Sequence, residues 1–130
     1  MIQTAITGLR SEVVLSLVGD TPLVPLRFEP EGVTIYAKCE FLNPSGSIKD
    51  RLAKTILVDA RNRGLLRHDS IILECSSGNT GIALAMVGAA LGLRVTILMS
   101  QGASEDRRRL IRQLGAELIL FDSAGAYQTG

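Results

Sequence analysis

The 130-residue chain contains no tryptophan, one histidine, two cysteines and four prolines. Two cysteines, Cys39 and Cys75, are too few for a disulfide framework or for a metal site built from thiolates. Fourteen basic and thirteen acidic side chains nearly balance, which argues against nucleic acid and membrane surfaces as partners. No apolar run reaches the roughly 18 residues of a membrane span, and residues 1–5 lack the basic start of a signal peptide. We therefore expect a cytoplasmic protein with reduced thiols.

The hydrophobic residues, 46% of the chain, fall into short segments of two kinds. Residues 33–40 alternate apolar and polar side chains, which predicts a half-buried strand. Nearly continuous apolar runs predict three central parallel strands, at residues 71–75, 95–99 and 118–121. Helical patterns lie between these strands, at residues 51–63, 80–91 and 105–114. This order predicts an α/β fold, an open parallel sheet with helices on both faces.

Residues 1–32 contain three of the four prolines and precede the first predicted strand–helix unit. They are expected to form a lead-in segment, with a short helix at residues 11–18 and a short strand at residues 22–27. Residues 33–130 are expected to form the α/β domain. A doubly wound chain normally continues after four strands, so we expect the first part of a larger protein.

The loop at residues 43–51, NPSGSIKDR, places Lys49 in the first turn of a predicted helix. The positive end of the helix dipole disfavours an ammonium group there and favours the neutral amine of a nucleophile or base. The alternative interpretation is a solvated lysine beside Asp50.

The loop at residues 76–81, SSGNTG, follows a predicted central strand and begins a helix. Its hydroxyls, its amide and its glycine-exposed backbone N–H groups could bind an anion, although an ordinary helix cap would have the same composition. Neither loop matches GxxxxGK[ST] or GxGxxG, so no sequence motif supports a binding site for a nucleoside triphosphate or NAD.

Three other groups of polar residues favour structural roles. His68 lies in a polar connection and is expected to be solvated, and the two cysteines are expected to be structural thiols. Arg107, Arg108, Arg109 and Arg112 are expected to form a solvated helix face or an interface.

Several segments together resemble the cysteine synthase and cystathionine β-synthase family of fold type II pyridoxal phosphate enzymes, which share a tryptophan synthase β-like fold. The matching segments extend over about 100 residues, at 19–24 (GDTPLV), 38–40 (KCE), 43–51, 74–81 and 104–117. The sequence contexts SIKDR and SGNTG look like those of cysteine synthases rather than of serine and threonine dehydratases.

The resemblance implies roles for individual residues. Lys49 would bind pyridoxal 5'-phosphate as a Schiff base and would remove the α-proton of the substrate. Asn79 would hydrogen-bond the 3-hydroxyl of the cofactor. The substrate carboxylate would be held by the loop residues Ser76, Ser77, Gly78, Asn79 and Thr80.

The implied reaction is a β-replacement that forms L-cysteine from an activated serine, such as O-acetylserine, and sulfide. One alternative is a cystathionine β-synthase or another β-substituted-alanine synthase. An alternative of a different class is a truncated, non-catalytic module that binds amino acids.

In the family, the glycine-rich phosphate cradle lies at positions that would follow Gly130. By resemblance, we expect the 130 residues alone to be inactive and residues 1–32 to pack on a larger lobe that is absent here. The full-length enzyme is implied to be a homodimer.

Overall fold

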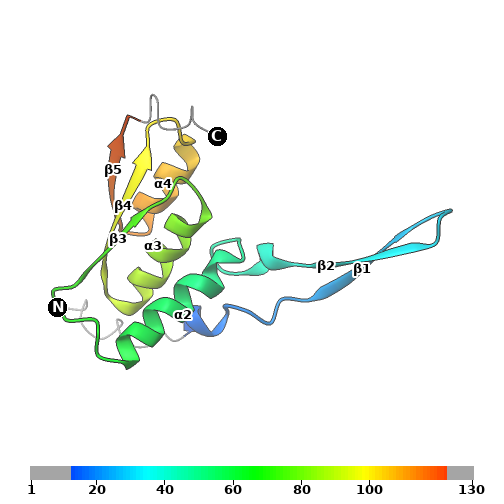
Figure 1. Cartoon of the computed structure of the whole chain (residues 1–130), viewed down its shortest axis with the longest axis horizontal. Helices are drawn as coiled ribbons and strands as arrows, with labels where there is room; N and C mark the ends of the chain where they lie inside the picture. Colours follow the sequence, from blue (N-terminus) through cyan, green and yellow to red (C-terminus); the bar gives the residue numbers. More distant parts are fainter. Residues whose placement is uncertain (1–12, 123–130) are drawn as a thin grey trace, which may run out of the picture.

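The computed structural model describes residues 13–122, which form a small α/β unit with a long projecting arm (Figure 1). The α/β unit contains a three-stranded parallel sheet in the order β3 (Ile71–Cys75), β4 (Arg94–Ser100) and β5 (Glu117–Phe121). Its helices are α2 (Lys49–Asn62), α3 (Asn79–Leu91) and α4 (Glu105–Gln113). The predicted parallel sheet with intervening helices is confirmed.

The core lies between the sheet and helices α3 and α4. Ile97 and Met99 of β4 are fully buried against Ile111 of α4 and the apolar side of α3. Because α3 is apolar on almost all sides, it also packs against α2, where Ala53 and Leu57 are buried. Burying these side chains against one another supplies most of the favourable free energy of such a unit.

The helices α3 and α4 pack on the same face of the sheet. On the opposite face of the described part of the chain, Leu73 is 66% exposed and Ile119 is 46% exposed. The sequence predicted helices on both faces, because continuous apolar runs are typical of strands covered on both sides. Within residues 13–122, one face is covered and the other presents apolar side chains.

The arm consists of β1 (Leu23–Phe28), β2 (Val33–Lys38) and residues 29–32 between them. The strands pair antiparallel, with Leu26 opposite Ile35, and form a sheet of their own. The prediction that residues 33–40 belong to the parallel sheet is therefore wrong. The alternating pattern identified a strand, but its partner is the neighbouring β1, joined to it by a short turn. Both strands are exposed, except that Ala37 is half-buried.

The arm continues into a 3-10 helix, η1 (Glu40–Leu42), which leads to the loop before α2. Residues 13–16 are helical, within the predicted helix at 11–18, of which residues 11 and 12 lie outside the described range. The division of domains at residue 32 stays a prediction, and the arm crosses that position. None of the helices within residues 13–122 is long and apolar enough to cross a membrane.

Candidate functional site

Lys49 is the first residue of α2, and its side chain is exposed. Its backbone N–H donates to the hydroxyl of Ser47 at 3.2 Å, which satisfies one of the amides that a helix start leaves without an internal partner. Ser47 itself is buried. The backbone of Lys49 is therefore fixed by this hydrogen bond, while its side-chain amine is accessible to a ligand.

Asp50, the next residue, is fully buried. Its carboxylate accepts a hydrogen bond from the backbone N–H of Ser45 at 2.6 Å and another from the Ser45 hydroxyl. These two bonds close the loop back onto the start of α2. Asp50 is thus a structural anchor of the turn, while the exposure of Lys49 is compatible with both interpretations made from the sequence.

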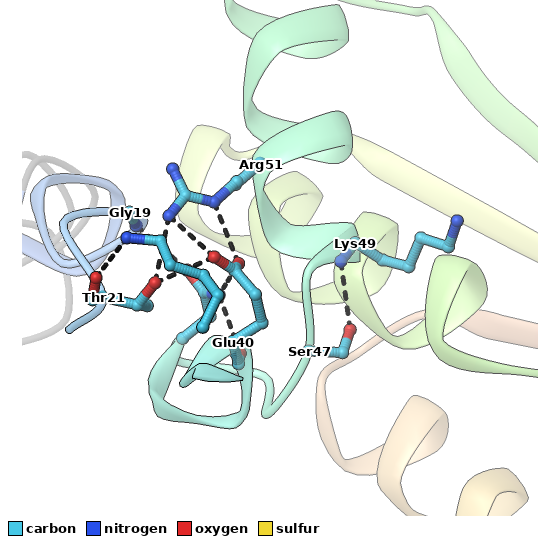
Figure 2. A network of polar contacts seen from close by, with 8 residues as sticks. Gly19, Thr21, Glu40, Ser47, Lys49 and Arg51 are labelled. Carbon is cyan, nitrogen blue, oxygen red and sulfur yellow. Dashed lines mark hydrogen bonds and ion pairs between the residues drawn. The ribbon is translucent and has the colours of Figure 1, made fainter. Parts of the chain in front are cut away.

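Arg51 is joined to the base of the arm by a network around Glu40 (Figure 2). The Glu40 carboxylate accepts bonds from Arg51 Nε at 2.9 Å and Nη2 at 3.0 Å. It also accepts bonds from the Thr21 hydroxyl and the Asn43 side-chain amide, both at 2.8 Å. The Asn43 side-chain oxygen in turn accepts the backbone N–H of Gly19 at 2.9 Å. One carboxylate therefore joins the residues before β1, the loop after β2 and the start of α2.

The electrostatics of this network keep Glu40 charged. Hydrogen bonding to Arg51, helped by Thr21 and Asn43, lowers the pKa of Glu40 to about 2. The same bond raises the pKa of Arg51 above its usual value. The pair is ionised throughout the neutral range.

The second loop begins where β3 ends. The backbone N–H of Ser76 donates to the Leu98 carbonyl at 3.0 Å, which extends the pairing with β4 by one residue. The Ser76 hydroxyl oxygen accepts the N–H groups of Gly78 and Gly81, each at 3.2 Å. Ser76 therefore caps the start of α3, and its hydroxyl hydrogen can still be donated to a ligand.

The remaining residues of the loop surround this cap. Gly78 precedes α3, and Asn79 and Thr80 are its first two residues. Ser77 and Asn79 are exposed, and Thr80 is half-buried. The N–H groups of Asn79 and Thr80 have no partner within the helix, as helix geometry requires. The loop thus offers hydroxyls, a side-chain amide and backbone N–H groups in one short segment.

The two loops lie at the same end of a packed pair of helices. Helices α2 and α3 pack together and run in roughly the same direction (Figure 1). Their N-terminal ends carry Lys49 and Asn79 respectively. An exposed amine and a set of anion-binding groups therefore face one end of the molecule, which suits a ligand with an electrophilic carbon and a carboxylate.

The arginine cluster on α4 is not simply a solvated face. Arg107 donates to the Ser77 carbonyl at 3.4 Å, so α4 supports the second loop from outside. Arg108 is only 17% exposed in its side chain, donates to the Gln101 carbonyl and pairs with Glu105 at 3.3 Å. The cluster is therefore partly structural.

The other candidate residues lie away from the two loops or at the ends of strands. His68 is exposed in the connection before β3. Both cysteines are free, with Cys39 half-buried and Cys75 exposed, so a structural role for the two thiols stays a prediction. Residues 13–122 contain no group of three or more metal-ligating side chains. A groove of about 330 Å³ runs between α2, β3 and α3. Of the loop residues, Thr80 lines it, and most of its other lining is apolar.

The family model described as pyridoxal-phosphate dependent enzyme matches residues 14–129, and this match defines the class of the chain. The chain belongs to this family, whose cofactor is pyridoxal 5'-phosphate.

Among its relatives, a cysteine synthase of Aquifex aeolicus is 48% identical over 116 residues, which cover 85% of this chain and 36% of the relative. An O-ureido-L-serine synthase of Streptomyces lavendulae is 50% identical over 109 residues, which cover 83% of this chain and 34% of the relative. The chain thus spans about a third of the length of these curated relatives.

A crystal structure of O-ureido-L-serine synthase superposes with a TM-score of 0.81 at 46% identity, covering 90% of this chain and 37% of that one. These likenesses confirm both the family resemblance and the α/β fold class inferred from the sequence.

The network around Glu40 was missed from the sequence, although its members lie in segments that carry the family resemblance. No periodicity connects Thr21, Glu40 and Arg51, since they belong to three different elements. The available signal would have been that Thr21, Glu40 and Arg51 are polar residues of the matching segments to which no role was assigned.

Proposed function

We propose that this chain supplies the covalent lysine and the substrate loop of a pyridoxal phosphate-dependent β-replacement enzyme. The product is L-cysteine, formed from an activated serine such as O-acetylserine and from sulfide. The observation that carries the proposal is the exposed Lys49 amine, at a helix start whose backbone is anchored on both sides. Similarity to relatives named cysteine synthase supports the choice of product.

The donors present fit pyridoxal phosphate at its reactive end. The exposed primary amine of Lys49 can bond to the cofactor aldehyde, and the exposed Asn79 amide can donate to the oxygen of the neighbouring 3-hydroxyl group. When bound, the cofactor supplies an electron-accepting ring that stabilises negative charge on the α-carbon of an amino acid.

The residues of this chain bind and orient the substrate and move its proton. The N–H groups at the start of α3, with the hydroxyls of Ser76, Ser77 and Thr80, hold the substrate carboxylate. Nζ of Lys49 takes the α-proton and later returns it. Departure of the β-substituent and addition of sulfide at the β-carbon complete the replacement.

A second candidate is a synthase that adds a different nucleophile to form another β-substituted alanine. The relative named O-ureido-L-serine synthase supports it, because its identity over the matched residues is similar to that of the cysteine synthase. The anchored lysine and the substrate loop would serve either reaction.

The test is product formation by a longer polypeptide that carries these residues together with the second lobe, supplied with pyridoxal phosphate, O-acetylserine and sulfide. We expect cysteine from the wild type and from Lys54→Ala, a matched control on the same helix. Lys49→Ala should lose at least about 100-fold in rate, because both attachment and proton transfer are lost. Preferred turnover of homocysteine or an amine over sulfide would favour the second candidate. Amino-acid binding without any turnover would favour the non-catalytic module.

A further inference from the structure

Three consecutive residues at the start of α2 are anchored by different partners. The Lys49 backbone is bonded to Ser47, the Asp50 carboxylate to Ser45, and the Arg51 guanidinium to Glu40. The first two anchors lie within the loop itself. The third is the one that reaches outside the loop, to the base of the arm.

The bond between Arg51 and Glu40 has a defined geometry. Arg51 binds Glu40 through two N–H groups, and a bidentate pair fixes orientation as well as distance. Thr21 and Asn43, which complete the coordination of Glu40, are 5% and 3% exposed. Gly19 packs so closely that a Cβ atom there would lie 3.2 Å from Arg51 Nη1. The Arg51 side chain is 39% exposed, and these contacts hold its guanidinium on the side that faces the arm.

The geometry connects this anchor to the lysine. In Figure 2 the Lys49 side chain extends away from the network, while Arg51 reaches into it. Side chains two positions apart on a helix do not face each other. Fixing Arg51 therefore sets the rotation of the first turn, and with it the direction in which Lys49 leaves the helix.

We propose that Glu40 and Arg51 are positioning residues for Lys49, which lock the first turn of α2 against the base of the arm so that Nζ meets the cofactor aldehyde in a fixed direction. This inference rests on the proposed function. It adds two residues to the proposed site and connects the orientation of Lys49 to the arm. It assigns a role to Glu40, whose carboxylate binds Arg51, Thr21 and Asn43.

The test is competitive labelling of the three lysines, Lys38, Lys49 and Lys54, in the full chain. One sample receives limiting pyridoxal phosphate followed by borohydride, and another receives trace acetic anhydride, which needs no binding site. Peptide mapping gives the ratio of label at Lys49 to label at Lys54 for each reagent. The variants are Glu40→Gln, which is nearly isosteric, and Arg51→Gln, which removes the bidentate pair without adding a lysine. Asp59→Asn is the control, because it removes an exposed pair on the same helix.

In variants whose circular dichroism shows that they are folded, we expect the pyridoxal phosphate ratio to fall by about 10- to 100-fold. The acetic anhydride ratio should stay unchanged, because the exposure of Lys49 is unchanged. An unaltered pyridoxal phosphate ratio in both folded variants would overturn the positioning role. Absence of any preference for Lys49 in the wild type would instead overturn the proposed function.

Discussion

Glu40 shows how one side chain can make stability depend on pH. Its pKa is about 2 in the folded chain, against an ordinary value of 4.5, because Arg51, Thr21 and Asn43 bind the charged form. A lowered folded-state pKa contributes stability that is present above about pH 4.5 and is lost as the pH falls toward 2.

We expect Glu40→Gln to flatten this part of the stability profile. Urea unfolding between pH 2 and 6 should show that the wild type loses its advantage over the variant as the pH falls through this window. Asp59→Asn should not reproduce the effect, since that carboxylate forms an exposed pair. A constant difference between wild type and Glu40→Gln at every pH would show that the ionised carboxylate is not what the network stabilises.

At the scale of elements, the cap of α3 can be tested directly. The Ser76 hydroxyl accepts two backbone N–H groups at the helix start, and losing such a cap costs about 1 kcal/mol. We expect Ser76→Ala to lower the free energy of unfolding by that amount and Ser76→Thr to keep most of it. Ser77→Ala, one residue along and exposed, should change it little. Equal stability of Ser76→Ala and the wild type would contradict the capping role.

The packing of α3 on β4 depends on Gly88. A Cβ atom at this position would lie 2.2 Å from Val95 Cγ2, so alanine forces one of the elements to shift. We expect Gly88→Ala to cost about 1–3 kcal/mol in the free energy of unfolding. In a Val95→Ala background the same change should cost less or stabilise the chain, because alanine favours the helix. An equal cost in both backgrounds would show that the two positions do not meet.

Sequence patterns predicted where helices and strands lie better than which strands pair with one another. The strand expected at residues 71–75 is observed as β3 (Ile71–Cys75), and the helix expected at residues 80–91 as α3 (Asn79–Leu91), because apolar runs and helical periodicity are local signals. The partner of β2 depended on the short turn to β1, which alternation alone does not reveal. The Lys49 and Ser76 loops followed from motif and resemblance, while the buried Asp50 and the Glu40 network depend on contacts between distant segments.

On the scale of the whole molecule, the arm and the open face of the sheet expose unusual amounts of apolar surface. Phe28 and Ile35 on the arm are 48% and 53% exposed. A two-stranded ribbon with both faces in solvent is marginally stable in water. A second lobe that covers residues 1–32, a homodimer and a cytoplasmic location stay predictions.

Hydrogen exchange can test the marginal stability of the arm. In the 130-residue chain, amides of β1 and β2 should exchange much faster than those of β4, whose side chains are mostly buried. A longer polypeptide with a second lobe should protect the arm. Equal protection of β1, β2 and β4 in the 130-residue chain would contradict an uncovered arm.

The central claim is that Lys49 is the residue that carries the cofactor. Its most direct test is the mass of the polypeptide after treatment with pyridoxal phosphate and borohydride, followed by peptide mapping. We predict a single pyridoxyl group on Lys49, which disappears in Lys49→Ala and persists in Lys54→Ala. A stable adduct on Lys38 or Lys54 instead, or no adduct in the wild type, would contradict the account.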